Sequence, residues 1–284
     1  MSPFGATQSG IETAGLTDLG LVRSNNEDSL FFVDGEMPEA SGARAFGIYL
    51  IADGMGGHQG GEIASRIAMR SISNALLEGL RNASGPVSAP AILKEALEIA
   101  HSEILSEARN NTRLRTMGTT ATVGLRLGCD LHLGHVGDSR AYLVREGRIK
   151  QLTDDHSVVG QLIKQGDITS QQGRTHPERG VLLRCLGVSR NVTVDTSIKG
   201  TQDNVLALRS GDALVFCSDG LTDSVSDGEI LRSVVTRPHP ADVCKDLIDK
   251  ANSRGGLDNT TVIVVKVPYP PSVRSASGLT SSPS

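Results

Sequence analysis

The stretch FGIYLIADG, residues 46–54, places an apolar run directly before an aspartate and a glycine. A short continuous apolar run bounded by turn residues is typical of a buried β-strand. Similar short apolar or alternating runs, bounded by Gly and Asp, recur at residues 120–125, 131–136, 141–145, 213–218 and 261–267. We predict a strand at each of them.

Two longer segments repeat apolar residues at helical spacing instead. They cover residues 61–80 and 92–108, and the breaker-rich residues 82–90 separate them. Turn signals at Gly128-Cys129-Asp130 and Glu146-Gly147 lie between neighbouring strand runs, which favours antiparallel hairpins. We predict an α+β fold in which antiparallel sheets carry helices on their outside.

The composition is that of a globular protein and excludes several kinds of partner. The 284 residues include 28 Lys+Arg and 32 Asp+Glu, a net charge of −4, and 38% of them are hydrophobic. Nucleic acids and anionic membranes are held mainly by excess Lys and Arg, so we expect neither as a partner. With 3% aromatic residues and no Trp, stacking on single-stranded nucleic acid is also not expected.

The sequence contains neither a metal-binding cysteine pattern nor a recognisable targeting segment. The four cysteines form no CxxC pair, which argues against a zinc knuckle or a disulfide framework. Residues 1–15 lack the basic and apolar regions of a secretory signal, and no run approaches 18 apolar residues. We expect a cytoplasmic protein, and a monomer as the default state.

No repeat or linker-like stretch interrupts residues 15–267, so we expect one domain there, after an N-terminal extension at residues 1–14. Residues 268–284 are rich in Pro, Ser and Gly, carry a single charge and are expected to be a disordered tail. Residues 157–180 are poorer in apolar residues. They form either a mobile surface flap or an ordinary helix with a loop, and the pattern does not separate the two.

Four carboxylates stand where predicted strands end or begin. Asp53, Asp138 and Asp219 follow strands, and Asp258 stands just before one. In antiparallel sheets the start of one strand and the end of its neighbour share an edge, so the four are expected at one rim. A single Asp-Gly pair commonly marks only a turn, but four such acids favour a common site. Gathered carboxylates need a neutralising cation, and oxygen ligands suit Mg²⁺ or Mn²⁺ rather than zinc.

The segment TDLGLVRSNNED, residues 17–28, places one arginine four residues before an acidic pair. A guanidinium group binds a tetrahedral oxyanion through two hydrogen bonds, and Glu27 or Asp28 would add a carboxylate to a metal cluster. Taken alone, Arg23 and this pair would be assigned to a surface salt bridge. The other motifs of the chain favour the site.

These motifs occur in a fixed order. They are the segment at residues 17–28, ADGMGGH at 52–58, MGTT at 117–120, VGDSR at 136–140, SDGL at 218–221 and GLDNTT at 256–261. As a set they resemble the bacterial form of the type 2C metal-dependent protein phosphatases, the PPM family. The resemblance covers nearly all of residues 15–267.

The resemblance implies a four-layer α-β-β-α sandwich, with two antiparallel β-sheets flanked by helices. It also implies hydrolysis of phosphoserine and phosphothreonine in proteins by water activated at a binuclear Mn²⁺ or Mg²⁺ centre. A third, weaker ion is common in bacterial relatives. The partners would be phosphorylated proteins, and the enzyme would oppose a bacterial Ser/Thr kinase.

The resemblance also assigns roles to residues. The implied metal ligands are Glu27, Asp53, Gly54, Asp138, Asp219 and Asp258. Asp53 would bridge the two ions, Asp219 and Asp258 would complete one coordination sphere, and Glu27 with the carbonyl of Gly54 would hold the other ion.

The remaining roles concern the third ion, the substrate and the surroundings of the ligands. Asp138 with Asp219 would hold the third ion. Arg23 would bind the substrate phosphate, and with Asp53 and Asp219 it forms the expected catalytic set. Three further residues are expected beside the ligands: Asp28, which would orient bound water, His58 and Asn259.

One departure from the family concerns the proton for the leaving alkoxide. Many eukaryotic relatives carry a histidine directly after the Asp-Gly pair, where this chain has Met55, and a thioether donates no proton. The acid is then either metal-bound water or another residue. His156 and His176 match family positions around residues 157–180, and we favour the interpretation of each as a local hydrogen-bonding group.

Two other functions fit the sequence less well than a protein phosphatase. An inactive phosphatase-like interaction module would be expected to lack one of the metal-position acids, and all of them are present here. A hydrolase of nucleotides or small phosphoesters would use the same chemistry. The glycines at residues 54–57 belong to the metal motif and not to a GxxxxGK loop, which argues against a nucleotide cradle.

Overall fold

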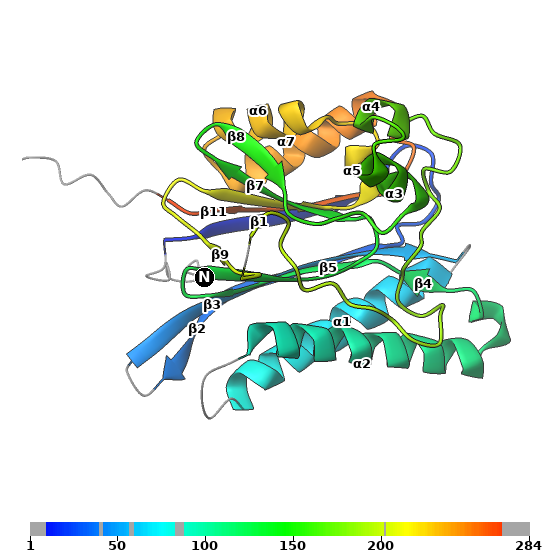
Figure 1. Cartoon of the computed structure of the whole chain (residues 1–284), viewed down its shortest axis with the longest axis horizontal. Coiled ribbons are helices and arrows are strands. Elements are labelled where there is room, and N and C mark those ends of the chain that lie inside the picture. Colours follow the sequence, from blue (N-terminus) through cyan, green and yellow to red (C-terminus); the bar gives the residue numbers. More distant parts are fainter. Residues whose placement is uncertain (1–9, 40–41, 57–59, 83–87, 202, 269–284) are drawn as a thin grey trace, which may run out of the picture.

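The structure of the chain is a computed structural model that describes residues 10–39, 42–56, 60–82, 88–201 and 203–268. Two antiparallel sheets lie face to face, and helices cover the outer face of each sheet (Figure 1). The layers follow one another as helix, sheet, sheet, helix. This arrangement confirms the predicted α-β-β-α sandwich.

The first sheet has the strand order β1-β11-β10-β7-β8. Its strands are β1 (Glu12–Asp18), β7 (Arg140–Arg145), β8 (Arg148–Gln151), β10 (Ala213–Cys217) and β11 (Thr260–Lys266). A two-residue turn joins β7 to β8, with φ of 51° at Glu146 and 70° at Gly147. Positive φ at both positions matches the right-handed twist of a hairpin, as the turn signal predicts.

The second sheet has the order β2-β3-β5-β6-β9, with β4 paired to the end of β3. Its strands are β2 (Asp28–Glu39), β3 (Gly42–Met55), β4 (Gly118–Thr119), β5 (Ala121–Leu127), β6 (Asp130–Val136) and β9 (Leu206–Ala207). Neighbouring strands pair antiparallel, and β2 runs along β3 from Asp28 opposite Asp53 to Glu39 opposite Gly42. The segment FGIYLIADG therefore lies in a central strand.

Helices α1 (Gly60–Asn82) and α2 (Ala89–Asn110) cover the second sheet, and a short 3₁₀ helix, η1 (Thr112–Leu114), follows them. Helices α5 (Asp219–Thr222), α6 (Asp227–Thr236) and α7 (Pro240–Ser253) lie on the side of the first sheet (Figure 1). Pro90 was predicted to separate the first two helices but lies in the first turn of α2. Its missing N–H would have no partner inside the helix at that position.

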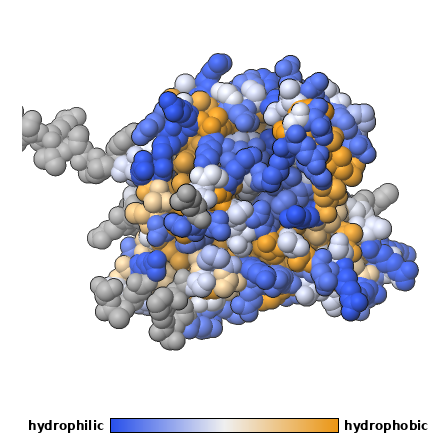
Figure 2. Space-filling view, viewed as in Figure 1, coloured by the Kyte–Doolittle hydropathy of each residue, from blue (hydrophilic) through white to orange (hydrophobic). Residues whose placement is uncertain are grey.

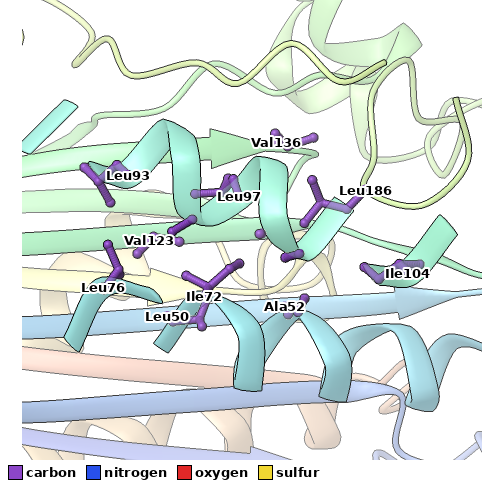
Figure 3. Close-up of a cluster of buried hydrophobic side chains, with 14 of the residues drawn as sticks. Leu50, Ala52, Ile72, Leu76, Leu93, Leu97, Ile104, Val123, Val136 and Leu186 are labelled. Atoms are coloured by element: carbon purple, nitrogen blue, oxygen red, sulfur yellow. The ribbon is translucent and has the colours of Figure 1, made fainter. Parts of the chain in front are cut away.

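Alternation along β3 explains why residues 48–52 form a continuous apolar run. Ile48, Leu50 and Ala52 pack against α1 and α2, in the cluster that Figure 3 shows. Tyr49 and Ile51 point the other way, into a second cluster between the two sheets. Successive side chains of a strand face opposite sides, so a strand covered on both faces needs apolar residues at every position.

The N-terminal boundary of the expected domain differs in the structure. Strand β1 begins at Glu12, inside the segment that was expected to be an N-terminal extension. It pairs along its whole length with β11, so the folded part starts before residue 15. Residues 1–9 of the expected extension and residues 269–284 of the expected tail lie outside the described residues.

The segment at residues 157–180 contains two short helices, α3 (Val158–Gln165) and α4 (Ser170–Gly173). Ser157 caps α3 by accepting a hydrogen bond from the Gly160 N–H at 3.1 Å, and the helix ends at Gly166 with φ of 83°. These are ordinary start and stop signals of a helix. Among the described residues, no helix combines the length and apolarity needed to cross a lipid bilayer.

Candidate metal centre

The carboxyl end of β3 carries Asp53, and its backbone is held from both sides. The Asp53 N–H donates to Thr120 Oγ1 at 3.0 Å, while the Asp53 carbonyl accepts from the Thr120 N–H and from Thr119 Oγ1, both at 2.8 Å. Both threonines belong to the motif MGTT. These bonds fix the backbone of Asp53 and so the direction of its carboxylate.

Gly54 allows three backbone segments to meet behind the site. A Cβ at this position would lie 2.1 Å from the carbonyl oxygen of Gly61 and 2.6 Å from that of Glu27, so no side chain fits. The Gly54 N–H donates to the Glu27 carbonyl at 3.1 Å. The Glu27 carboxylate lies against the first turn of α1, because a Cβ on Gly61 would be 2.6 Å from its Oε2.

Two further acids approach Asp53 from other strands. Asp138 follows β6 after Gly137, whose φ of 117° turns the chain sharply. Asp219 follows β10 and begins α5, and its charge helps to raise the pKa of Asp53.

Asn259 connects the segment before β11 to the loop between β1 and β2. Its amide nitrogen donates to the carbonyls of Leu19 at 2.9 Å and Asn25 at 3.1 Å, and its amide oxygen accepts from the Glu27 N–H at 2.8 Å. The side chain therefore sets the position of Glu27 relative to Asp258.

The candidate residues line one pocket of about 460 Å³. Its lining includes Arg23, Asn25, Glu27, Asp53, Gly54, Met55, Asp138, Asp219, Asp258 and Asn259. A larger groove of about 930 Å³ beside α3 and α4 shares Asp138 and Asp219 with it. Four of the expected ligands thus come from strand ends, at one rim as the antiparallel pattern predicts.

Arg23 and Asp258 form an ion pair at the mouth of the pocket, with 2.7 Å between Nη2 and Oδ2. Both side chains remain partly exposed. The hydrogen bond to Asp258 raises the pKa of Arg23, which therefore stays charged. In this arrangement the guanidinium group is already at the pocket, held by a carboxylate that is itself an expected ligand.

Burial and mutual repulsion raise the pKa of the acids in the pocket. The pKa of Asp53 and that of Asp219 lie well above the usual range, mainly because both side chains are buried and then because of neighbouring carboxylates. Burial, and then the charge of Asp155, raise the pKa of Asp138 to about 7. Among the described residues, the positive charges near Asp53, Asp138 and Asp219 do not offset the burial and mutual repulsion of these carboxylates.

Asp28 lies behind the pocket and not in its lining. One of its carboxylate oxygens accepts from Ser218 Oγ at 2.8 Å and from Thr261 Oγ1 at 2.7 Å. Burial raises its pKa to about 6, against the opposite effect of these two hydrogen bonds. Ser218 and Thr261 belong to the motifs SDGL and GLDNTT, next to Asp219 and near Asp258. The sequence analysis gave these two hydroxyl side chains no role, and the structure shows that both hold Asp28.

The histidines named from the sequence lie in different places. His58 lies outside the described residues. His156 lines the larger groove, and Met55 lines the pocket. Asp223, four residues after Asp219, was not singled out in the sequence, although that spacing places it one helical turn away. It lines the larger groove, where burial raises its pKa.

The donor set fits hard divalent cations. The pocket offers carboxylate oxygens and the Gly54 backbone, and its described lining contains neither His nor Cys. As they stand, the described His, Cys, Asp and Glu side chains form no group of three arranged around one point. Asp258 is turned toward Arg23, with which it forms an ion pair.

Comparison with known proteins decides the family. A family model described as protein phosphatase 2C matches residues 24–245. This chain belongs to the protein phosphatase 2C family. The serine/threonine phosphatase stp of Listeria innocua is 37% identical over 258 residues, which cover 88% of this chain and 93% of that protein.

Solved phosphatase 2C structures share the fold. The serine/threonine phosphatase PstP of Mycobacterium tuberculosis has a TM-score of 0.75 at 35% identity, covering 91% of this chain and 99% of that one. A structure of the PstP catalytic domain in complex with two manganese ions has a TM-score of 0.73 at 35% identity, with the same coverage. The chain is a protein serine/threonine phosphatase of the bacterial PPM family, acts on phosphoproteins and is metal-dependent.

Proposed function

We propose that this phosphatase hydrolyses phosphoserine and phosphothreonine with two Mn²⁺ or Mg²⁺ ions held by Glu27, Asp53, the Gly54 carbonyl, Asp219 and Asp258. The observation that carries the proposal is the single pocket in which these groups meet. Bound there, divalent cations supply an acidified water molecule and neutralise charge on the phosphoryl oxygens. Asp138 with Asp219 would hold a third, weaker ion.

The chain's own residues would position the substrate. Arg23 has a planar guanidinium group that binds two phosphoryl oxygens at once. Its partial exposure at the mouth of the pocket leaves it accessible to a phosphorylated side chain. Asp53, clamped by Thr119 and Thr120, keeps its orientation while substrate enters and leaves. A rigid first layer of groups lowers the reorganisation needed in the transition state.

The class of reaction that supplies the substrate follows from its chemistry. Phosphoserine and phosphothreonine in proteins arise by phosphoryl transfer to a hydroxyl group, so a Ser/Thr kinase is the partner activity that this enzyme would oppose. The names of the relatives, which are serine/threonine phosphatases, support this substrate class.

The test is Mn²⁺-dependent phosphate release from a phosphothreonine peptide. We expect turnover with Mn²⁺, none with excess chelator, and a loss of about 100-fold or more in kcat for Asp219→Asn, in line with the loss of a key electrostatic group. Asp130→Asn is the matched control, because Asp130 is exposed at the start of β6, away from the carboxyl end that leads to Asp138. Full turnover in chelator, or in Asp219→Asn, would contradict the proposal.

A further inference from the structure

Several exposed apolar side chains lie close to the mouth of the pocket. In the described part of the chain, the large apolar residues that are more than half exposed are Leu21 (70%), Leu257 (67%), Val22 (64%), Val235 (62%), Leu183 (51%) and Val188 (51%). Leu21, Val22 and Leu257 adjoin Arg23 and Asp258 in the sequence. Single exposed apolar residues are ordinary on a protein surface, but a group of them marks a place of contact.

One side of the mouth is a joined surface made by two loops. The Leu21 N–H donates to the Gly256 carbonyl at 2.7 Å. The Leu21 side chain lies over Gly256, where a Cβ would be 2.9 Å from Leu21 Cγ, and the Leu257 side chain lies over Gly255. The two leucines therefore cover one glycine turn, directly beside the ion pair of Arg23 with Asp258.

The other side of the mouth is apolar as well. Met55 and Leu182 line the pocket itself. The side chains of Met55 and Val188 converge, since a Cβ on Gly118 would lie 2.9 Å from Met55 Cε and 2.9 Å from Val188 Cγ2. We call Leu21, Val22 and Leu257 together with Met55, Leu182 and Val188 the apolar rim. Figure 2 shows apolar surface at the end of the molecule where Figure 1 places the loop between β1 and β2.

The rim and the pocket differ in what they bind. The pocket holds carboxylates and one guanidinium group, which suit ions and a phosphate. The rim offers only hydrocarbon and a thioether; Met55 and Leu182 line the pocket, and Leu21, Val22 and Leu257 adjoin the lining residues Arg23 and Asp258 in the sequence. A phosphorylated side chain that reaches the pocket brings its neighbours in the peptide over the rim. We propose that the apolar rim binds the residues on either side of the phosphorylated Ser or Thr, so that preferred substrates carry apolar side chains there. This inference rests on the proposed function.

The first experiment compares two phosphothreonine peptides of equal length and net charge with the full chain and Mn²⁺. One has Leu or Val on each side of the phosphothreonine, and the other has Ser at those positions. We expect kcat/KM to be about tenfold higher for the apolar peptide, the gain that burying two such side chains in part provides. Equal values, or a preference for the Ser peptide, would overturn the proposal.

The second experiment assigns the preference to the rim. In the double variant Leu21→Ser/Leu257→Ser, the ratio of kcat/KM for the apolar peptide to kcat/KM for a small aryl phosphate should fall about tenfold. Val235→Ser is the matched control, since Val235 is as exposed but lies on α6, beside a groove at the opposite end of β1 and β11. The control should keep the wild-type ratio.

Other outcomes have distinct meanings. An unchanged ratio in the double variant would overturn the inference while leaving the proposed function intact. Absence of Mn²⁺-dependent hydrolysis of the small aryl phosphate by the wild-type chain would overturn both. Sedimentation that shows a wild-type dimer lost in the double variant, with the peptide ratio unchanged, would assign the rim to contact between two copies of this chain and overturn the proposal.

Discussion

Asn259 shows how one side chain can organise a site without touching the chemistry. It uses both amide donors and its oxygen on three backbone groups of the loop that carries Arg23 and Glu27. The sequence placed Asn259 beside Asp258, and the motif marked it as a neighbour of the ligands. Which groups it would bond was not predictable, because its partners lie more than 230 positions earlier in the chain.

We predict that Asn259→Asp lowers the free energy of unfolding by about 1–3 kcal/mol, since a carboxylate leaves two carbonyls without their donor. The Mn²⁺ concentration for half-maximal activity should rise, because Glu27 loses its fixed position. Urea unfolding and a Mn²⁺ titration of activity measure the two effects. Asn110→Ala, at the exposed end of α2, is the control. An unchanged Mn²⁺ requirement would show that Glu27 does not depend on Asn259.

At the scale of elements, four of the strands outside the predicted runs lie at the edges of the sheets. β1 and β8 are the edges of the first sheet, and β2 and β9 are those of the second. The central strands β3, β5, β10 and β11 are buried along nearly their whole apolar runs, whereas β1 and β8 are only half-buried or exposed. An edge strand covers less of the core, so its sequence keeps polar residues and glycines that weaken the strand pattern.

The segment from β8 to α3 is tied to the turn that carries Asp138. The His156 N–H donates to the Gly137 carbonyl at 2.7 Å, and His156 Nδ1 accepts from the Gly137 N–H at 3.2 Å. His156 Nε2 faces Arg184 and Asp195 at 3.4 and 3.8 Å. The sequence left His156 as either a family position or a local hydrogen-bonding group, and these bonds show the second role.

Two substitutions separate the two ends of this imidazole. An Asn oxygen reaches about where Nδ1 lies, whereas a Gln side chain reaches toward Nε2. We predict that His156→Asn retains most of the stability, while His156→Gln leaves the Gly137 N–H unpaired and loses about 1–3 kcal/mol. Thermal and urea unfolding of the two variants measure these losses of stability. A loss in His156→Asn as large as in His156→Gln would contradict the prediction, and a larger loss in His156→Asn would mean that the contacts of Nε2 dominate.

At the scale of the whole molecule, the expected ligands come from both sheets. Asp53 lies in β3 of the second sheet, while Asp219 follows β10 and Asp258 precedes β11 of the first. Ions bound between them would link the two halves of the sandwich. Their charge would also offset the repulsion that raises the pKa of the buried acids.

We predict that Mn²⁺ at about 100 times its dissociation constant stabilises the fold by about 2.7 kcal/mol. For a chain of this size the Tm rises by about 5–10 °C. Asp219→Asn should be at least as stable as the wild type in chelator, because it removes a buried repelling charge, and it should gain less from Mn²⁺. Differential scanning calorimetry measures both. An equal Mn²⁺ shift in Asp219→Asn would place the ions elsewhere.

The sequence by itself determined the central strands, the two long helices, the fold class and the acids that stand at strand ends. Periodicity and strand-end position are local properties, so they are readable without the chain path. Only the tertiary structure decided that Asp28 lies behind the pocket and that Arg23 pairs with Asp258 across 235 positions. It also decided that Leu21 and Leu257 cover one glycine turn beside this pair. Each of these depends on which distant segments the two sheets bring together, and no local pattern records that.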